Sequence, residues 1–176
     1  MATSISVPVE EYLRTTYHPD MEYVDGELVE RHVGEHKHSR LQTEVVLELG
    51  PRQRARGFRV CTEQRLRVLG TKNRYRIPDV CVMALPYHSE PVLTTPPHLV
   101  IEILSPEDET ADILAKVADY LRFGVSNIWI ANPYQRTVQE VDREGIRYCT
   151  NLAPETDLVG CVDFNDLFAK MDEPTE

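Results

Sequence analysis

The sequence predicts a mixed α/β fold in which helices cover a central sheet, and three observations support this. Residues 98–104 are almost all apolar, which is typical of a strand buried on both faces. Residues 36–49 and 110–123 repeat apolar side chains at helical spacing, so each segment is expected to form an amphipathic helix. Several short strand-like runs lie between the two helices. This order of elements indicates a mixed sheet with helices packed on it.

The first elements are set by capping and turn residues. Ser6 and Pro8 precede a short helix, and the pair Asp25-Gly26 predicts a hairpin turn. Gly50-Pro51 is expected to end or bend the first long helix. The expected elements of this part are a short helix, a hairpin and a long helix, at residues 10–13, 21–24 with 27–32, and 36–49.

The remaining elements are bounded by glycine and proline signals. Gly124 should stop the second long helix, Glu144-Gly145 should turn a second hairpin, and Asp163 should cap a closing helix to about Lys170. The expected strands of this part are residues 58–63, 65–69, 75–83, 98–104 and 127–131, with the second hairpin at 137–143 and 146–151.

The bulk composition indicates one soluble domain over residues 1–176. This length is enough to bury a single core of ordinary size. No apolar run approaches the roughly 20 residues that cross a bilayer, and the first residues lack a signal-peptide pattern, so a cytoplasmic protein without membrane contact is expected. The four cysteines are far apart and form no CxxC pair, which indicates neither a zinc site nor a disulfide framework. No organic cofactor is expected.

The charge is unevenly distributed. A formal net charge of −10 argues against simple electrostatic binding of nucleic acid. Residues 31–76, however, hold 12 Lys and Arg against 4 Asp and Glu, whereas the rest of the chain holds 7 against 25. This asymmetry permits a basic face, and it equally fits a solvated arginine-rich surface without a partner.

Two carboxylates interrupt apolar strands. Glu102 stands among five aliphatic residues, where an unpaired charge would be costly, so it needs an internal ion pair, an exposed strand end or a bound cation. Asp79 precedes the apolar run of the strand before it and is alternatively a turn or capping residue. If the two strands are neighbours, the carboxylates converge, and Mg²⁺ or Mn²⁺ would favour such a pair of oxygen ligands.

Lys116 is the candidate cation for this pair. It lies in the helical row Asp112, Lys116 and Tyr120, which borders the apolar stripe and could point back to the sheet. Taken alone, a helical lysine is more often solvated. Beside two buried acids, it could orient an attacking water or stabilise charge on a phosphate.

These residues resemble the Uma2 family of restriction-endonuclease-like proteins over about residues 8–168. The resemblance rests on the Asp79 and Glu102 strands, on the helix after them, on the first hairpin and on one histidine: Ile77-Pro78-Asp79-Val80, residues 97–106, Lys116, Tyr120, residues 124–130, residues 22–29 and His36. It implies a restriction-endonuclease-like core at about residues 20–168, with an added N-terminal hairpin and C-terminal hairpin.

The family's nuclease fold, PD-(D/E)XK, implies a metal held by an aspartate and a second acid, with a lysine two positions after that acid. Asp79 and Glu102 match, but the lysine position is Leu104. In the resembling proteins a lysine on the next helix replaces it, and Lys116 occupies that place. This departure fits a relocated catalytic lysine, and it also fits a member that binds metal or nucleic acid without cutting.

The resemblance implies further site residues. Glu27 matches the hairpin motif and is expected to be a third catalytic acid, with Glu44 on the first long helix as the rival. His36 and Tyr120 are expected to support the site, while two of the three clustered histidines, His32, His36 and His38, should lie on the surface. Among the cations that lead into Asp79, the expected nucleic-acid contacts are Arg67, Arg74 and Arg76.

The function expected from these residues is a Mg²⁺- or Mn²⁺-dependent endonuclease that hydrolyses phosphodiester bonds of nucleic acid, DNA in preference to RNA. Asp79 and Glu102 would hold the metal, and Lys116 would position the water. One alternative is a non-catalytic nucleic-acid-binding or regulatory module that retains the fold, and another is a structural oligomer in which the acids are paired internally. A homodimer is expected only by analogy with enzymes of this fold.

Overall fold

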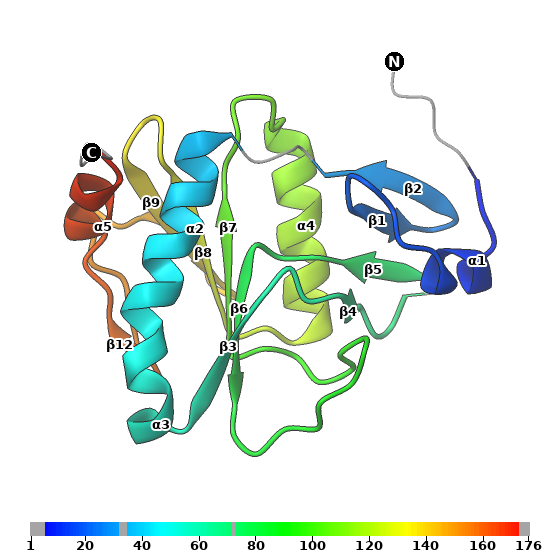
Figure 1. Ribbon diagram of the computed structural model, residues 1–176, viewed down its shortest axis with the longest axis horizontal. Coiled ribbons are helices and arrows are strands. Elements are labelled where there is room, and N and C mark those ends of the chain that lie inside the picture. The colour runs from blue at the N-terminus through cyan, green and yellow to red at the C-terminus, as the bar shows by residue number, and fades with distance from the viewer. Residues whose placement is uncertain (1–5, 32–34, 72, 173–176) are drawn as a thin grey trace.

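The computed structural model describes residues 6–31, 35–71 and 73–172, and its centre is a six-stranded sheet (Figure 1). The strand order is β10-β9-β8-β7-β6-β3, and only β7 and β8 run parallel. The strands are β3 Phe58–Thr62, β6 Val80–Ala84, β7 Leu99–Ile103, β8 Asn127–Asn132, β9 Thr137–Asp142 and β10 Gly145–Tyr148. Helix α4, Thr110–Phe123, makes the crossover that the parallel pair requires.

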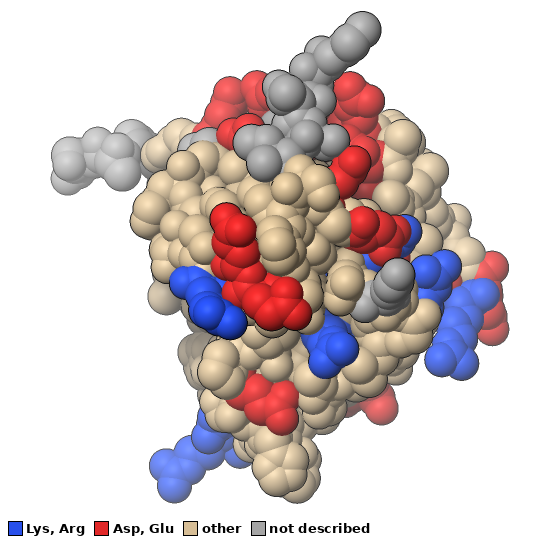
Figure 2. Space-filling model, turned by 90° about the vertical axis from the view of Figure 1, so that its right-hand side faces the viewer, with Lys and Arg blue, Asp and Glu red and all other residues tan. Residues whose placement is uncertain are grey.

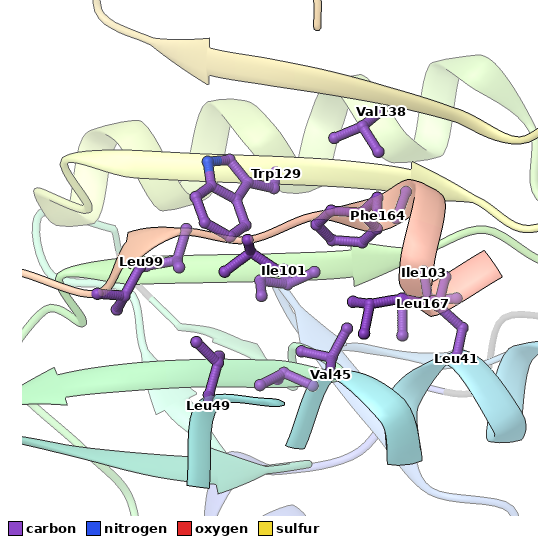
Figure 3. Packing of buried hydrophobic residues seen from close by; sticks show 14 of the residues in the cluster. Leu41, Val45, Leu49, Leu99, Ile101, Ile103, Trp129, Val138, Phe164 and Leu167 are labelled. Atoms are coloured by element: carbon purple, nitrogen blue, oxygen red, sulfur yellow. The ribbon is translucent and has the colours of Figure 1, made fainter. Parts of the chain in front are cut away.

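Helices cover both faces of this sheet. Helix α2, His36–Leu49, and helix α5, Phe164–Met171, pack on one face, and α4 packs on the other. Under α2 and α5, side chains such as Val45, Ile101 and Trp129 form a continuous apolar layer (Figure 3). The burial of both faces explains why β7 is apolar at every position except Glu102. The expected mixed α/β fold is confirmed.

A second, four-stranded sheet stands beside the first, in the order β2-β1-β5-β4. Its strands are β1 Met21–Val24, β2 Glu27–Glu30, β4 Leu66–Arg67 and β5 Arg74–Arg76, and helix α1, Val9–Arg14, packs near them. Tyr12 of α1 lies against Tyr23 and Tyr75, with ring centroids 4.9 and 5.5 Å apart. This aromatic cluster covers one face of the small sheet.

The single strand expected at residues 75–83 is two strands in two different sheets. Strand β5 pairs with β1 and β4, whereas β6 pairs with β3 and β7. Pro78 lies between them, and because proline has no backbone N–H, a ladder is readily interrupted there. Asp79 therefore stands at the point where the chain passes from the small sheet to the large one.

Helix α4 ends in a left-handed glycine, as the sequence predicts. Gly124 has φ +105°, and its N–H donates to Leu121 O while the N–H of Val125 donates to Tyr120 O. This pair of hydrogen bonds is the Schellman arrangement, which satisfies carbonyls that a helix end leaves unpaired. The turn delivers the chain directly into the buried strand β8.

The chain also contains small elements that periodicity does not predict. They are a 3₁₀ turn at Gly50–Arg52, a short helix α3 at Gln53–Arg56, and a two-stranded ribbon of β11 Glu155–Thr156 and β12 Gly160–Cys161. Asp163 caps α5 as expected, accepting from the N–H groups of Asn165 and Asp166. In the described part of the chain, no helix is both long enough and apolar enough to cross a bilayer.

Candidate active site

Asp79 and Glu102 lie at one end of the large sheet, where His38 of α2 contacts Asp79 and Lys116 of α4 contacts Glu102. Strands β6 and β7 are antiparallel, with Val80 opposite Ile101, and continuing this register by one residue sets Asp79 opposite Glu102. Residues opposite each other in a ladder project to the same face. Both side chains are at least 96% buried, with exposures of 4% for Asp79 and 3% for Glu102.

Asp79 is held by three donors from three elements. Its Oδ1 accepts from Arg31 Nη2 at 2.6 Å, and its Oδ2 accepts from the Ile103 N–H at 2.7 Å and lies 3.3 Å from His38 Nε2. Burial opposes ionisation of this carboxyl, but the hydrogen bond and charge of His38, the charge of Arg31 and the Ile103 N–H outweigh it and lower the pKa of Asp79. Asp79 is therefore an anion at neutral pH.

Glu102 has a different environment. Tyr120 donates its hydroxyl proton to Oε1 at 2.5 Å, and Lys116 Nζ lies 3.4 Å from Oε2. Burial raises the pKa of Glu102 to about 7, because it outweighs the charge of Lys116, and the neighbouring acids Asp79 and Glu22 raise it further. The two acids of the site thus have pKa values shifted in opposite directions.

Lys116 reaches the pair from α4, where it and Tyr120 stand four residues apart on the face toward the sheet. Burial opposes its charge, but the acids Glu102, Glu22 and Asp79 prevail and raise the pKa of Lys116. The ammonium therefore keeps its proton at the edge of the site. The structure brings Asp79, Glu102, Lys116 and Tyr120 together, as the sequence predicts.

A buried ion-pair chain supports the site from the small sheet. Arg76, 4% exposed, donates to Glu22 at 2.7 Å and to Asp119 at 2.9 Å. Arg74 continues the chain from Asp119, at 2.8 Å, to Asp25. Arg76 is enclosed by acids, but it also borders a hollow together with Lys116, so its expected role as a nucleic-acid contact stays a prediction. Arg74 is likewise committed to two carboxylates.

Other expected residues lie outside this cluster. Glu27 is exposed on β2, and the acid that the hairpin sends inward is Glu22 of β1, 1% exposed. Glu44 is buried on α2 but contacts Arg40, at 3.2 Å, rather than Asp79. His36 is exposed at the start of α2, and Arg67 is exposed on β4. His32 lies outside the described residues.

Sequence reasoning missed His38 and Arg31. His38 is 8% exposed, and it lies three and seven residues before Leu41 and Val45 of the buried stripe. That helical spacing was the signal that could have identified it. Arg31 follows β2 directly, and no periodic pattern in the sequence marks it as buried. It reaches Asp79 only because the hairpin folds over α4.

A hollow of about 20 Å³ lies between the two acids, bordered also by Arg31, Ile103 and Lys116. It is large enough for one water or one ion. No group of three or more His, Cys, Asp or Glu side chains in residues 6–31, 35–71 and 73–172 is arranged as a metal site. Two carboxylates nevertheless fit Mg²⁺, which usually takes one or two carboxylates and fills its other positions with water and substrate phosphate.

Two wider hollows flank this central one. A hollow of about 180 Å³ lies on the hairpin side, between β1–β2 and α4, and includes Arg31 and Lys116 in its wall. A cleft of about 520 Å³ lies on the opposite side, between α4 and strands β8 to β10. Asp108, in the loop before α4, borders all three spaces. Together they form an interrupted path across the end of the sheet.

The arginine-rich segment does not produce a continuous basic face at the hairpin end. Figure 2 shows Lys and Arg interspersed there with Asp and Glu. Several arginines of the segment are used internally: Arg31 on Asp79, Arg40 on Glu44 and the Lys170 carbonyl, Arg52 on Glu48 and the Cys161 carbonyl, and Arg74 and Arg76 in the ion-pair chain. Five of the twelve cations of this segment are therefore committed to acids of the protein itself.

The fold and the site together define a mixed α/β protein with two buried acids on adjoining strands and a lysine beside them. Residues 9–166 match the family model described as "Uma2: Putative restriction endonuclease". The chain therefore belongs to the Uma2 family, and family and fold together indicate a nuclease acting on nucleic acid.

A solved structure shows the same fold. It is titled as a putative nuclease belonging to DUF820 from Anabaena variabilis ATCC 29413, and it aligns with a TM-score of 0.81 at 20% identity, covering 94% of this chain and 99% of that one. At this identity the likeness concerns the fold. No curated protein shows significant similarity to the chain.

Proposed function

We propose that this protein is a Mg²⁺- or Mn²⁺-dependent endonuclease that hydrolyses phosphodiester bonds, with DNA favoured over RNA. The observation that carries the proposal is the pair Asp79 and Glu102, buried on neighbouring strands beside Lys116. Burying two acids together is costly unless a cation compensates them. The DNA preference is supported by the description of the family as a restriction endonuclease.

Asp79 and Glu102 would hold the ion, and the Ile103 carbonyl would be a further oxygen ligand. When bound, a divalent ion supplies a lowered pKa for an attacking water and neutralises charge on the scissile phosphate. The bonds that Asp79 makes in this structure leave capacity for an ion, because each carboxylate oxygen has two lone pairs.

The chain's own groups have separate tasks around this pair. Lys116 Nζ, fixed by Glu102, would orient the water and stabilise negative charge that develops on the phosphate oxygens. Arg31 adds a second cation on the hairpin side, where the 180 Å³ hollow would admit the phosphate. Tyr120 holds Glu102 Oε1, so that Oε2 faces Lys116.

Two observations favour a second candidate, a nucleic-acid-binding module that does not cut. Asp79 is already paired with Arg31 and His38, and Leu104 occupies the usual lysine position, where it packs against the apolar cluster under α4. In such a protein the internal cations would replace the ion permanently.

Calorimetric titration of Mn²⁺ into wild type, Asp79→Asn and Asp157→Asn would test the proposal, followed by incubation of each protein with supercoiled plasmid and Mn²⁺. Asp157 is the control because its side chain is 91% exposed. Wild type and Asp157→Asn should bind the ion and nick the plasmid, and Asp79→Asn should do neither.

Wild-type protein that binds plasmid but neither takes up Mn²⁺ nor nicks it would overturn the nuclease proposal in favour of the binding module. Circular dichroism of Asp79→Asn separates loss of the site from loss of the fold.

A further inference from the structure

The 520 Å³ cleft between α4 and strands β8 to β10 has no role in the proposed chemistry. It adjoins the central hollow at Ser105 and Asp108, which border both. Its volume lies within the range of about 300–1,000 Å³ that is usual for small-molecule sites. A substrate whose phosphate lies at Asp79 and Glu102 would therefore have its adjoining nucleotide at the mouth of this cleft.

The cleft lacks the positive charge that would bind the phosphates of a nucleic-acid backbone. Among its described lining residues, Asp108 is the one charged side chain, and there is no Lys or Arg. Duplex DNA carries about one negative charge per 1.7 Å of its axis, so a duplex laid along this wall would meet no counter-charge. The part of a nucleotide that suits an uncharged cleft is its base.

The cleft offers both kinds of contact that a base requires. Tyr148 on β10 is 65% exposed, and Ile146 and Leu114 are each 46% exposed, which leaves an aromatic ring and two aliphatic side chains open to a flat ligand. Gln135, Thr137 and Gln139 add amide and hydroxyl groups to the wall. Stacking on an aromatic ring with polar groups at the base edge is how unpaired nucleotides are held.

We propose that this cleft seats an unpaired nucleobase next to the cleaved phosphate, so that the substrate is single-stranded or locally unpaired nucleic acid. The inference rests on the proposed function, since it takes the acids as the place of cleavage. In a duplex, the base would first have to leave the stack, at a cost that unpaired substrates avoid.

The test is fluorescence anisotropy with a labelled 20-nucleotide DNA, single-stranded or as duplex, in EDTA so that binding is measured without cleavage. Tyr148→Ala should weaken single-strand binding by about 5- to 100-fold, as expected for loss of one stacked base, and duplex binding by less than about twofold. Tyr148→Phe, which keeps the ring, should stay within about twofold of wild type.

Leu47→Ala is the matched control, because Leu47 is 62% exposed on α2 and does not line the cleft. It should leave both affinities unchanged. Single-strand affinity that is unaffected by Tyr148→Ala would overturn the inference, as would equal losses for single strand and duplex.

Sedimentation velocity of the same variants tests whether a second copy of the chain, and not a base, occupies the cleft. A wild-type dimer that Tyr148→Ala converts to a monomer would overturn the inference, because the cleft would then be covered by a second copy of the chain. Failure here is distinguishable from failure of the proposed function. A protein that nicks plasmid but is insensitive at Tyr148 refutes the cleft alone, whereas one that binds neither DNA nor Mn²⁺ refutes the function itself.

Discussion

The two acids of the site differ in the groups that compensate their negative charge. Asp79 has a guanidinium, a histidine and a backbone N–H within hydrogen-bonding distance or close to it, which lower its pKa. Glu102 is as deeply buried as Asp79 but has only a hydroxyl and a lysine to compensate its charge, so burial dominates and raises its pKa. One carboxylate is thus fully charged at neutral pH, and the other titrates near it.

The raised pKa of Glu102 makes the stability of the metal-free protein depend on pH. Folded Glu102 retains its proton up to about pH 7, whereas the unfolded residue loses it near pH 4.5, so the folded state binds more protons between these values and stability falls as pH rises through the window. Denaturant unfolding in EDTA should show wild type losing on the order of 1–3 kcal/mol relative to Glu102→Gln from pH 5 to pH 8.

The informative quantity is the difference between the two proteins at each pH, since groups away from the site titrate equally in both and the difference isolates Glu102 with the groups that it contacts. A difference that is constant from pH 5 to pH 8 would show that Glu102 has an ordinary pKa in the folded state.

At the residue scale, the sequence predicts the buried groups better than their partners. Glu102 is conspicuous because it interrupts an apolar strand, and Lys116 and Tyr120 follow from helical spacing. Arg31 could not be predicted in the same way, since its contact with Asp79 spans 48 residues and depends on how the hairpin docks. The ion pairs of Arg76 were missed because an arginine beside a predicted site is more naturally interpreted as a substrate contact.

The elements that carry the site are well specified by local signals. Helix α2 spans His36–Leu49 and helix α4 spans Thr110–Phe123, as the apolar spacing predicts, and Gly124 ends the second. The prediction of one strand at residues 75–83 was wrong. The strand-like sequence pattern continues through Pro78, but the backbone hydrogen-bond ladder is interrupted there. Pairing partners are a tertiary property, so periodicity alone could not assign β5 and β6 to different sheets.

The end of α4 provides a test at this scale. Gly124→Ala should destabilise the protein by about 1–2 kcal/mol, because a left-handed backbone is unfavourable for a residue with a Cβ. The added carbon would meet Pro96 at 3.5 Å, an ordinary contact, so the cost is conformational rather than steric.

Gly50→Ala is the control for that substitution. Gly50 has right-handed helical angles, and nothing lies within 4 Å of an added Cβ. Its replacement should be neutral or stabilising by up to about 1 kcal/mol. Equal effects of the two substitutions in chemical denaturation would contradict the assignment of the Schellman cap.

Across the whole molecule, charge joins the two sheets in addition to an apolar cluster in which Leu66 of β4 packs with Cys81 and Val100 of the large sheet. The ion-pair chain runs from Asp25 and Glu22 of the small sheet through Arg74 and Arg76 to Asp119 of α4, which lies against the large sheet. Buried ion pairs contribute little net stability when complete, but they are costly when one partner is removed.

Arg76→Met should therefore destabilise the protein by about 3–5 kcal/mol, because it leaves Glu22 and Asp119 buried without their shared cation. The control is Arg147→Met on β10, whose exposed pairs with Glu140 and Asp142 should be worth less than about 1 kcal/mol. Thermal unfolding of both variants at neutral pH compares them. A loss at Arg76 no larger than that at Arg147 would indicate that the chain of ion pairs is solvated.

The passage of the chain from one sheet to the other at Pro78-Asp79 has a mechanical consequence. The acids of the site belong to the large sheet, while Arg31 belongs to the hairpin of the small one. The contact between Arg31 and Asp79 thus also fastens the hairpin to the large sheet, and it persists if the ion binds to the lone pairs of Asp79 that remain free. We expect the amide hydrogens of β1 and β2 to exchange at unchanged rates when Mn²⁺ is added, and faster exchange would show that the ion displaces Arg31.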